Sequence, residues 1–216
     1  MKLLREYVRQ LLTEGAKGLD DLVANDMYVV VGKDSEGDAL IYYSNKDDLR
    51  RNVVPKHREK RVWGDITIVH SDPKVTGPCS SAMSVEYVEA APGWGPMLYD
   101  VAIEIATQEA GGLAPDRKSV SKEAKRVWDY YLHMRGDVQS HQLDLTDEDI
   151  EDAAAYAKPS LQLKKLTPDI DTDDCLQTDN IRNHKGNWDK TPTSKRYTKP
   201  PTTLKALRDA GRLIES

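Results

Sequence analysis

The chain has 216 residues, of which 31 are basic and 36 acidic, and its net charge is −5. This length is enough for one large domain with its own hydrophobic core. Apolar residues make up 38%, below the share usual for a compact domain, so we expect part of the chain to pack poorly. The two cysteines are far apart, the histidines are scattered, and no apolar run approaches the roughly 20 residues of a membrane span. These features argue against disulfide scaffolds, zinc ribbons and membrane proteins, and predict a protein of the reducing cytoplasm.

The charges are distributed unevenly along the chain. Residues 142–174 carry 3 basic and 10 acidic groups, whereas residues 175–216 carry 9 basic and 4 acidic groups. This pattern fits neither an evenly basic nucleic-acid binder nor a uniformly acidic protein, and it favours two solvated segments that attract each other. In the less favoured alternative, the basic tail binds nucleic acid through phosphate contacts and through stacking of Trp188 and Tyr197.

The first half of the chain predicts one helix followed by an antiparallel sheet. Residues 2–13 are expected to form an amphipathic helix that ends before Gly15, because their apolar residues recur at helical spacing. Strands are expected at residues 27–33, 39–45, 62–70 and 81–90. The first two strands flank the turn-forming residues 34–38 and so predict a hairpin, and a charged loop follows over residues 46–61.

Helical spacing replaces strand alternation after Pro-Gly-Trp-Gly-Pro at residues 92–96. A mostly buried helix is expected over residues 97–109, with Asp100, Glu104 and Gln108 on its remaining face, and a second helix begins after the capping residue Ser121. The sequence HQLDL at 141–145 is the last expected strand. The order of elements predicts an α+β fold.

The C-terminal third predicts less regular structure. A capping-box pattern at Thr146 opens an acidic helix that ends before Pro159. Beyond this helix we expect an irregular tail that is docked by Trp188 and Tyr197 and carries a short last helix at 203–210. The expected divisions of the chain are residues 1–14, 20–145 and 146–216.

The best candidate for a ligand site is the succession of strand 81–90, a glycine loop and a buried helix. Gly93 and Gly95 allow the backbone to approach a ligand closely, and the helix N-terminus offers unpaired amides with a partial positive charge. Such an arrangement suits a pyrophosphate group. A simple strand-to-helix turn is the alternative interpretation.

Over residues 60–135 the sequence resembles the GNAT superfamily of acyltransferases. The resemblance is carried by the loop Ala-Ala-Pro-Gly-Trp-Gly at 90–95, the helix after it and the second helix SKEAKRVWDYYLHM. The sequence departs from the family at Ala90, where Arg or Gln is usual, and at Pro96, which lacks an amide donor. The resemblance implies a mixed, mostly antiparallel sheet with helices packed on it, and acetyl-CoA as a substrate without a metal. The residues that it implies for acetyl-CoA binding are Gly93, Trp94, Gly95, Met97 and Leu98.

Acyl transfer to an amine requires two proton transfers, and each needs a side chain that acts as a base or as an acid. The amine must lose a proton before it attacks the thioester, and the leaving thiolate must gain one. Glu86 or Glu89, at the end of its strand, is expected to act as the base through a water molecule, and Tyr130 as the acid. Tyr131 lies on the apolar stripe of its helix and is expected in the core. Outward-pointing strand residues without a role are the alternative for the two glutamates.

The first 14 residues, MKLLREYVRQLLTE, resemble the cleavable capsid-targeting peptide of tailed phages. The resemblance implies a cut after Leu-Thr-Glu, before Gly15, with a prohead scaffold and a prohead protease as partners. A detachable amphipathic helix can dock on such a scaffold. The location implied is the host cytoplasm or the interior of the phage capsid. The alternative is a helix that packs on its own domain.

Two further patterns carry weaker hypotheses. Cys79, together with a histidine, has the residue types of a thiol nucleophile and its base, although an inert packed thiol is the favoured interpretation. The acidic residues at 169, 171 and 173 match a calcium loop in part, but the glycine and the bidentate glutamate of that loop are missing.

The leading hypothesis is a phage-encoded GNAT-like protein that transfers an acetyl group from acetyl-CoA to an amine and is packaged in the virion. Its competitor is a catalytically silent internal virion protein or interaction protein with the same fold, and the third is a cysteine hydrolase that uses Cys79. An acyl-CoA binder needs free amides over residues 93–98 and a slot beside strand 81–90. A silent protein would fill that slot with Trp94 or Met97.

Overall fold

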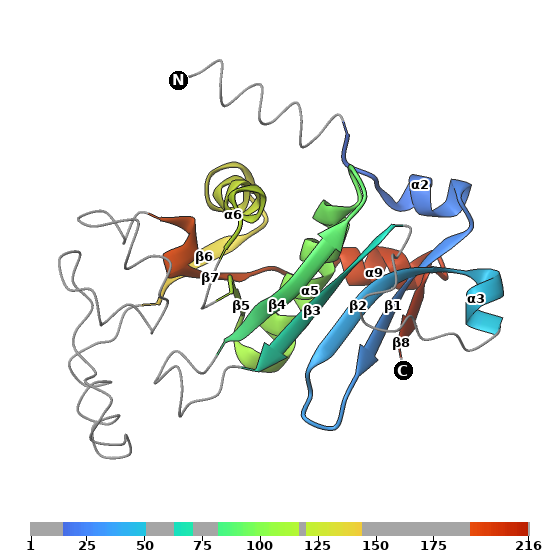
Figure 1. Cartoon of the computed structure of the whole chain (residues 1–216), viewed down its shortest axis with the longest axis horizontal. Coiled ribbons are helices and arrows are strands. Elements are labelled where there is room, and N and C mark those ends of the chain that lie inside the picture. The colour runs from blue at the N-terminus through green and yellow to red at the C-terminus, as the bar shows by residue number, and fades with distance from the viewer. Residues whose placement is uncertain (1–14, 51–62, 71–81, 117–119, 144–190, 216) are drawn as a thin grey trace. The chain divides into compact units, whose positions relative to one another are not determined.

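The structure is a computed structural model of the chain, and it describes residues 15–50, 63–70, 82–116, 120–143 and 191–215 (Figure 1). Several features expected from the sequence lie outside the described residues. They are the helix at 2–13 with its cut, Cys79, the acidic helix after Thr146, the acidic residues at 169–173, and Trp188.

The elements follow one another in the order of an α+β protein. The helices are α2 (Leu19–Ala24), α3 (Lys46–Arg50), α5 (Gly95–Ala110), α6 (Lys122–Met134) and α9 (Thr202–Asp209), with a 3-10 turn, η3, at Pro192–Ser194. The strands are β1 (Met27–Lys33), β2 (Ala39–Asn45), β3 (Gly64–His70), β4 (Met83–Ala90), β5 (Leu113–Ala114), β6 (Gln139–Gln142), β7 (Lys195–Thr198) and β8 (Leu213–Glu215).

Hydrogen bonds order the strands β6-β7-β5-β4-β3-β2-β1-β8 in one mixed sheet. The pairs β4–β5 and β1–β8 are parallel, and the pairs β1–β2, β2–β3, β5–β7 and β6–β7 are antiparallel. The chain divides into two compact units. The first comprises Met1–Val69, Glu86–Ile105 and Pro201–Ser216, and the second comprises His70–Val85 and Ala106–Pro200.

In the first unit, β1, β2 and β3 form a sheet with two different faces, because side chains alternate along each strand. The register places Val29, Val31, Ile41, Tyr43, Ile66 and Ile68 on one face, the apolar face. These side chains are at most 5% exposed and form a core. The other face carries Tyr42, Ser44, Asp65 and Thr67, which are at most 7% exposed, together with the apolar Val30 and Leu40. The sheet is therefore buried on both sides here, and polar side chains are confined to one of the two faces.

The hairpin between β1 and β2 closes as its turn residues predict. One carboxylate oxygen of Asp34 accepts from the amides of Glu36 (2.9 Å) and Asp38 (3.0 Å). Gly37 adopts a φ of 85°, which glycine tolerates without strain. The antiparallel register follows directly, from Lys33 beside Ala39 to Met27 beside Asn45.

In the first unit, a long-range cap fixes α9, whose own N-cap, Pro201, makes no side-chain hydrogen bond. The carboxylate of Glu104, on α5, accepts from the amides of Thr203 and Leu204, both at 2.7 Å. Glu104 is completely buried, although the sequence places it on the remaining face of its helix, with Asp100 and Gln108. Helix α9 covers Glu104, and the otherwise unpaired amides at the start of α9 point toward the Glu104 carboxylate.

In the second unit, Tyr197 on β7 is completely buried and its ring stacks on Trp128 of α6 at 4.9 Å. The Tyr197 hydroxyl donates to the Pro192 carbonyl at 2.6 Å. Burial raises the pKa of this phenol well above its usual range, so it stays a neutral donor. The expectation that Tyr197 docks the tail is confirmed.

The α+β class and its strands at the start of the chain are confirmed, and so is the Ser121 cap, whose hydroxyl oxygen accepts from the Ala124 amide at 3.1 Å. The prediction of an irregular tail is wrong at β7 and β8, which pair with other strands of the sheet. The strand expected at 141–145 is β6, which spans Gln139–Gln142, and residues 144 and 145 lie outside the described part of the chain. Helix α3 occupies part of the expected charged loop. These elements are too short for a periodic pattern to reveal them.

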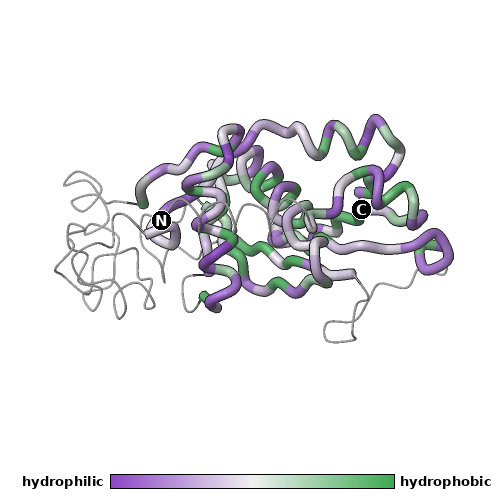
Figure 2. The backbone as a smooth tube through the Cα atoms, turned by 90° about the horizontal axis from the view of Figure 1, so that it is seen from above, coloured by the Kyte–Doolittle hydropathy of each residue, from purple (hydrophilic) through white to green (hydrophobic). Residues whose placement is uncertain are grey.

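Hydrophobic and hydrophilic residues alternate along most of the described chain, with no long uniformly hydrophobic stretch (Figure 2). Within the described residues, no helix is long and apolar enough to cross a membrane.

Candidate functional site

The glycine loop between β4 and α5 lies in the first unit. Gly93 has a φ of 85° and its carbonyl accepts from the Lys17 amide at 2.8 Å. A Cβ on Gly93 would lie 1.9 Å from the Gly15 carbonyl oxygen, so only glycine allows this approach. The amide of Trp94 donates to the Ala91 carbonyl at 3.0 Å. The segment that starts at Gly15 thus lies directly against one side of the loop.

An aromatic cluster anchors the end of the loop. The Trp94 ring is 3% exposed and meets the rings of Tyr43 and Trp63 edge-on, both at 5.0 Å. The Tyr43 hydroxyl donates to the Trp94 carbonyl at 2.7 Å. Burial raises the pKa of Tyr43 well above its usual range, which keeps this donor protonated. The loop is therefore held on the apolar face of the sheet by packing and by a hydrogen bond.

At the start of α5, main-chain amides rather than side chains are the groups that could bind a ligand. Met97 and Leu98 are at most 7% exposed, so their side chains belong to the core. The first amides of a helix have no acceptor within the helix, and the first turn of α5 contains no acidic residue. Gly95 is half-buried, and a Cβ there would lie 3.7 Å from the Ala90 Cβ, an ordinary contact. This end of α5 has the polarity that favours an anion.

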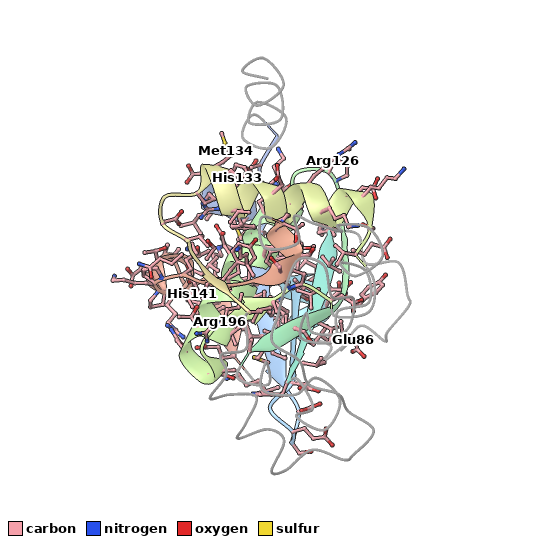
Figure 3. All side chains as sticks on the ribbon, turned by 90° about the vertical axis from the view of Figure 1, so that its left-hand side faces the viewer. Glu86, Arg126, His133, Met134, His141 and Arg196 are labelled. Atoms are coloured by element: carbon pink, nitrogen blue, oxygen red, sulfur yellow. The ribbon has the colours of Figure 1, made fainter. Side chains whose placement is uncertain are left out.

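Strand β4 changes character along its length. Its first three residues are buried, whereas Glu86 and Glu89 are exposed (Figure 3 labels Glu86). In the first unit, Glu89 accepts from the hydroxyl of Tyr87 at 2.6 Å, and Tyr87 is 46% exposed. Parallel pairing of β4 with β5 is confined to Met83 and Ser84. The end of β4 that leads into the glycine loop is thus the accessible part of the strand.

Tyr130, the candidate acid, lies on α6 in the second unit. Its side chain is half-buried and its ring meets that of Tyr131 edge-on at 5.8 Å. Tyr131 is 2% exposed, so its expected place in the core is confirmed. Tyr130 and the two glutamates of β4 belong to different units.

A charged cluster in the second unit was not anticipated from the sequence. Arg135 donates two hydrogen bonds of 2.7 Å to the Asp137 carboxylate, and the Lys199 ammonium lies 3.8 Å from it. The hydrogen bonds from Arg135 lower the pKa of Asp137 to about 2. Lys199 is only 1% exposed. The cluster joins the turn after α6 to the end of β7.

The histidines of the described residues have separate surroundings. His141 on β6 hydrogen-bonds with the Thr198 hydroxyl at 2.9 Å, and it faces Arg196 of β7 across the ladder (Figure 3). His133 lies 3.5 Å from Asp129 on the surface of α6, and His70 is exposed at the end of β3. Among the described residues, no group of three or more histidine, cysteine, aspartate or glutamate residues could hold a metal ion.

Comparisons with protein-family models, with curated proteins and with solved structures found no match for this chain.

Sequence reasoning also missed the buried Asp65 and Thr67 of β3. Their signal is present in GDITIVH, where a charged residue and a hydroxyl residue alternate with isoleucines. Alternation usually indicates a solvated face, yet both residues are at most 7% exposed. A charge on a buried face, rather than alternation alone, is the informative feature.

Proposed function

We propose that the protein is a GNAT-like N-acyltransferase that binds acetyl-CoA at the glycine loop and transfers the acetyl group to an amine. The observation that carries this proposal is the accessible end of β4, which runs into a glycine loop and then into the amide-rich start of α5. Ligands of sheets that contain parallel β-α-β connections commonly bind beyond the carboxyl ends of such strands. The parallel β4–α5–β5 connection has this arrangement.

In the proposed reaction the protein forms no covalent bond to the acyl group, and its side chains only accept and donate protons. The neutral amine nitrogen attacks the thioester carbon, the carbon–sulfur bond breaks, and the amine proton passes to a base while the thiolate is protonated. Glu86 and Glu89 are exposed carboxylates at the end of β4, and either is suited to accept the proton through water. Tyr130, which belongs to the second unit, stays a prediction from the sequence as the proton donor to sulfur. The amides of Gly95, Met97 and Leu98 are the proposed partners of the pyrophosphate.

A second candidate, a silent protein with the same fold, is favoured by the packing of the loop itself. Trp94 and Met97 are both buried, the Trp94 amide is already donated, and the Gly15 carbonyl lies against Gly93. These contacts reduce the number of loop amides left for a pyrophosphate. Binding of acetyl-CoA discriminates the two candidates.

We expect acetyl-CoA to raise the melting temperature of the full chain, and Gly95→Glu to abolish the shift. A ligand that binds only the folded state stabilises it by about 2.7 kcal/mol at a hundredfold excess over Kd. The substituted carboxylate would repel the pyrophosphate at the start of α5. An acidic residue there interacts favourably with the helix dipole, so the fold should be retained. Differential scanning fluorimetry with millimolar acetyl-CoA measures both effects.

Gly136→Glu is the matched control, because it adds the same charge at an exposed glycine with open space around it. This variant should keep the full acetyl-CoA shift. A wild-type protein whose melting temperature is unchanged by millimolar acetyl-CoA would exclude the enzyme and leave the silent candidate.

We further propose that the protein is packaged in a phage capsid through residues 1–14 and cut after Glu14. Support comes from the sequence of this segment and from the exposed Gly15, Ala16 and Lys17 that follow it. Exposed chain is accessible to a protease. Intact-mass spectrometry of the protein recovered from particles is expected to show a chain that starts at Gly15. A recovered chain that still starts at Met1 would contradict the cleavage.

A further inference from the structure

Residues 15–17, which we call the strap, lie against the glycine loop in the first unit. The Lys17 amide donates to the Gly93 carbonyl at 2.8 Å. The Gly15 carbonyl oxygen lies so close to Gly93 that a Cβ there would overlap it. The strap is exposed, whereas Gly93 is half-buried. The strap therefore covers the loop from the solvent side, at its first glycine.

The glycine at position 93 allows another group to approach the main chain of the loop closely. Its φ of 85° favours glycine, and the missing side chain leaves room directly beside the backbone. The group that occupies this room is the Gly15 carbonyl of the same chain. A ligand that approaches Gly93 from this side therefore competes with the strap for the same space.

Helix α2 anchors the strap at its C-terminal end. Gly18 is the N-cap of α2, and its amide donates to the Asp21 carboxylate at 2.9 Å. This hydrogen bond lowers the pKa of Asp21, so the carboxylate stays charged and keeps the cap. Leu22 of the same helix is completely buried and holds α2 on the core. Gly18 itself has open space around it, which suits a hinge between the fixed helix and the strap.

The contacts that hold the strap on the loop are few. Among the described residues, one backbone hydrogen bond, from Lys17 to Gly93, joins the two segments. The ion pair of Lys17 with Asp21, at 3.1 Å, is exposed and ties the strap to α2 rather than to the loop. A backbone hydrogen bond and an exposed ion pair each contribute little to stability. The docked and released positions of the strap therefore differ by a free energy small enough for a ligand to overcome.

We infer that residues 15–17 are an autoinhibitory strap, which docks on the glycine loop at Gly93 and is displaced when acetyl-CoA binds there. This assigns a regulation to the proposed acetyl-CoA site and in that sense rests on the proposed function. The contact between Gly15 and Gly93 is then the closed state of the site. Residues 1–14 continue directly into the strap, so a partner that binds them is placed to release it.

Lys17→Pro in the full chain tests the strap, because proline has no amide to donate to Gly93. We expect isothermal titration to show that this variant binds acetyl-CoA about fivefold more tightly than the wild type, as for loss of one hydrogen bond that favours the closed state. Lys17→Ala is the matched control, since it removes the same side chain and its ion pair with Asp21 but keeps the amide. Its affinity should stay within about twofold of the wild type.

Hydrogen exchange of the wild type gives a second measurement, which needs no substitution. The Lys17 amide is hydrogen-bonded although the strap is exposed, so its exchange should be slowed in the free protein. Saturating acetyl-CoA should accelerate this exchange, because the ligand displaces the strap from Gly93. A ligand that only stabilises the fold slows exchange instead, so acceleration at Lys17 is a result that a purely structural contact would not produce.

The two measurements separate the inference from the proposed function. If acetyl-CoA binds Lys17→Pro and the wild type equally, or does not accelerate exchange at Lys17, the autoinhibitory strap fails and the acyltransferase stands. If acetyl-CoA binds neither protein, the acyltransferase fails and the strap fails with it. Tighter binding by Lys17→Pro than by Lys17→Ala, together with faster exchange at Lys17 in the wild type, supports both.

Discussion

Glu104→Ala is expected to destabilise the protein by about 3–5 kcal/mol. The Glu104 carboxylate is fully buried and accepts from the amides of Thr203 and Leu204 at 2.7 Å. Alanine would leave two donors at the start of α9 without an acceptor, and each such donor costs about 1–3 kcal/mol when water is excluded. The loss of negative charge at a helix N-terminus adds to this cost. Urea unfolding of the full chain measures the change in free energy.

Two companion variants show whether capping is responsible. Glu104→Gln keeps one acceptor oxygen and nearly the same volume, so it should cost less than alanine. Glu109→Ala removes an exposed glutamate from the same helix and should stay within about 0.5 kcal/mol of the wild type. If Glu104→Ala unfolds within 1 kcal/mol of the wild type, on the order of a surface change, the carboxylate does not hold α9.

Glu104 also shows where sequence reasoning on this chain stops. Helical periodicity correctly locates α5, because its apolar residues recur with the period of a helix over several turns. Periodicity describes only which residues share a side, and it assigns a charged side to water by default. The partner of Glu104 is nearly one hundred residues away along the chain, at |i−j| = 99 and 100. No local pattern can report such a contact.

The tail was difficult to predict for a related reason. β7 has the sequence KRYT and β8 has LIE, which are too short to show alternation. They are strands because sheet neighbours supply partners, β5 and β6 for one and β1 for the other. Tertiary pairing decides such segments, and local propensity does not.

At the candidate site, the positions of the strand, the loop and the helix could be predicted, but the contacts that their residues make could not. The strand, the glycine loop and the helix lie where the sequence indicates. The sequence could not show that Trp94 would pack on Tyr43, or that Gly15 would lie against Gly93. Both contacts join segments far apart in the chain, and both bear directly on how many loop amides are left for a ligand.

Gly64→Ala is expected to destabilise the first unit by about 3 kcal/mol, from backbone strain and from a clash that no rotamer relieves. Gly64 has a φ of 131°, a region essentially restricted to glycine. A Cβ there would lie 2.6 Å from the Glu89 carbonyl oxygen and 2.7 Å from the Ala90 Cα, both main-chain atoms. Relief requires the end of β4 to move away from β3, and urea unfolding measures the cost.

The glycine loop begins at this contact, so the same substitution tests how the loop is positioned. The Ala91 amide donates to the Trp63 carbonyl at 3.0 Å, and its hydrogen exchange should accelerate in Gly64→Ala as the strands separate. Gly136→Ala, at a glycine with open space and no positive φ, should leave both stability and exchange near the wild-type values. An unchanged exchange rate at Ala91 in Gly64→Ala would mean that the loop is held by its aromatic anchor, Trp94, and not by the approach of β3 to β4.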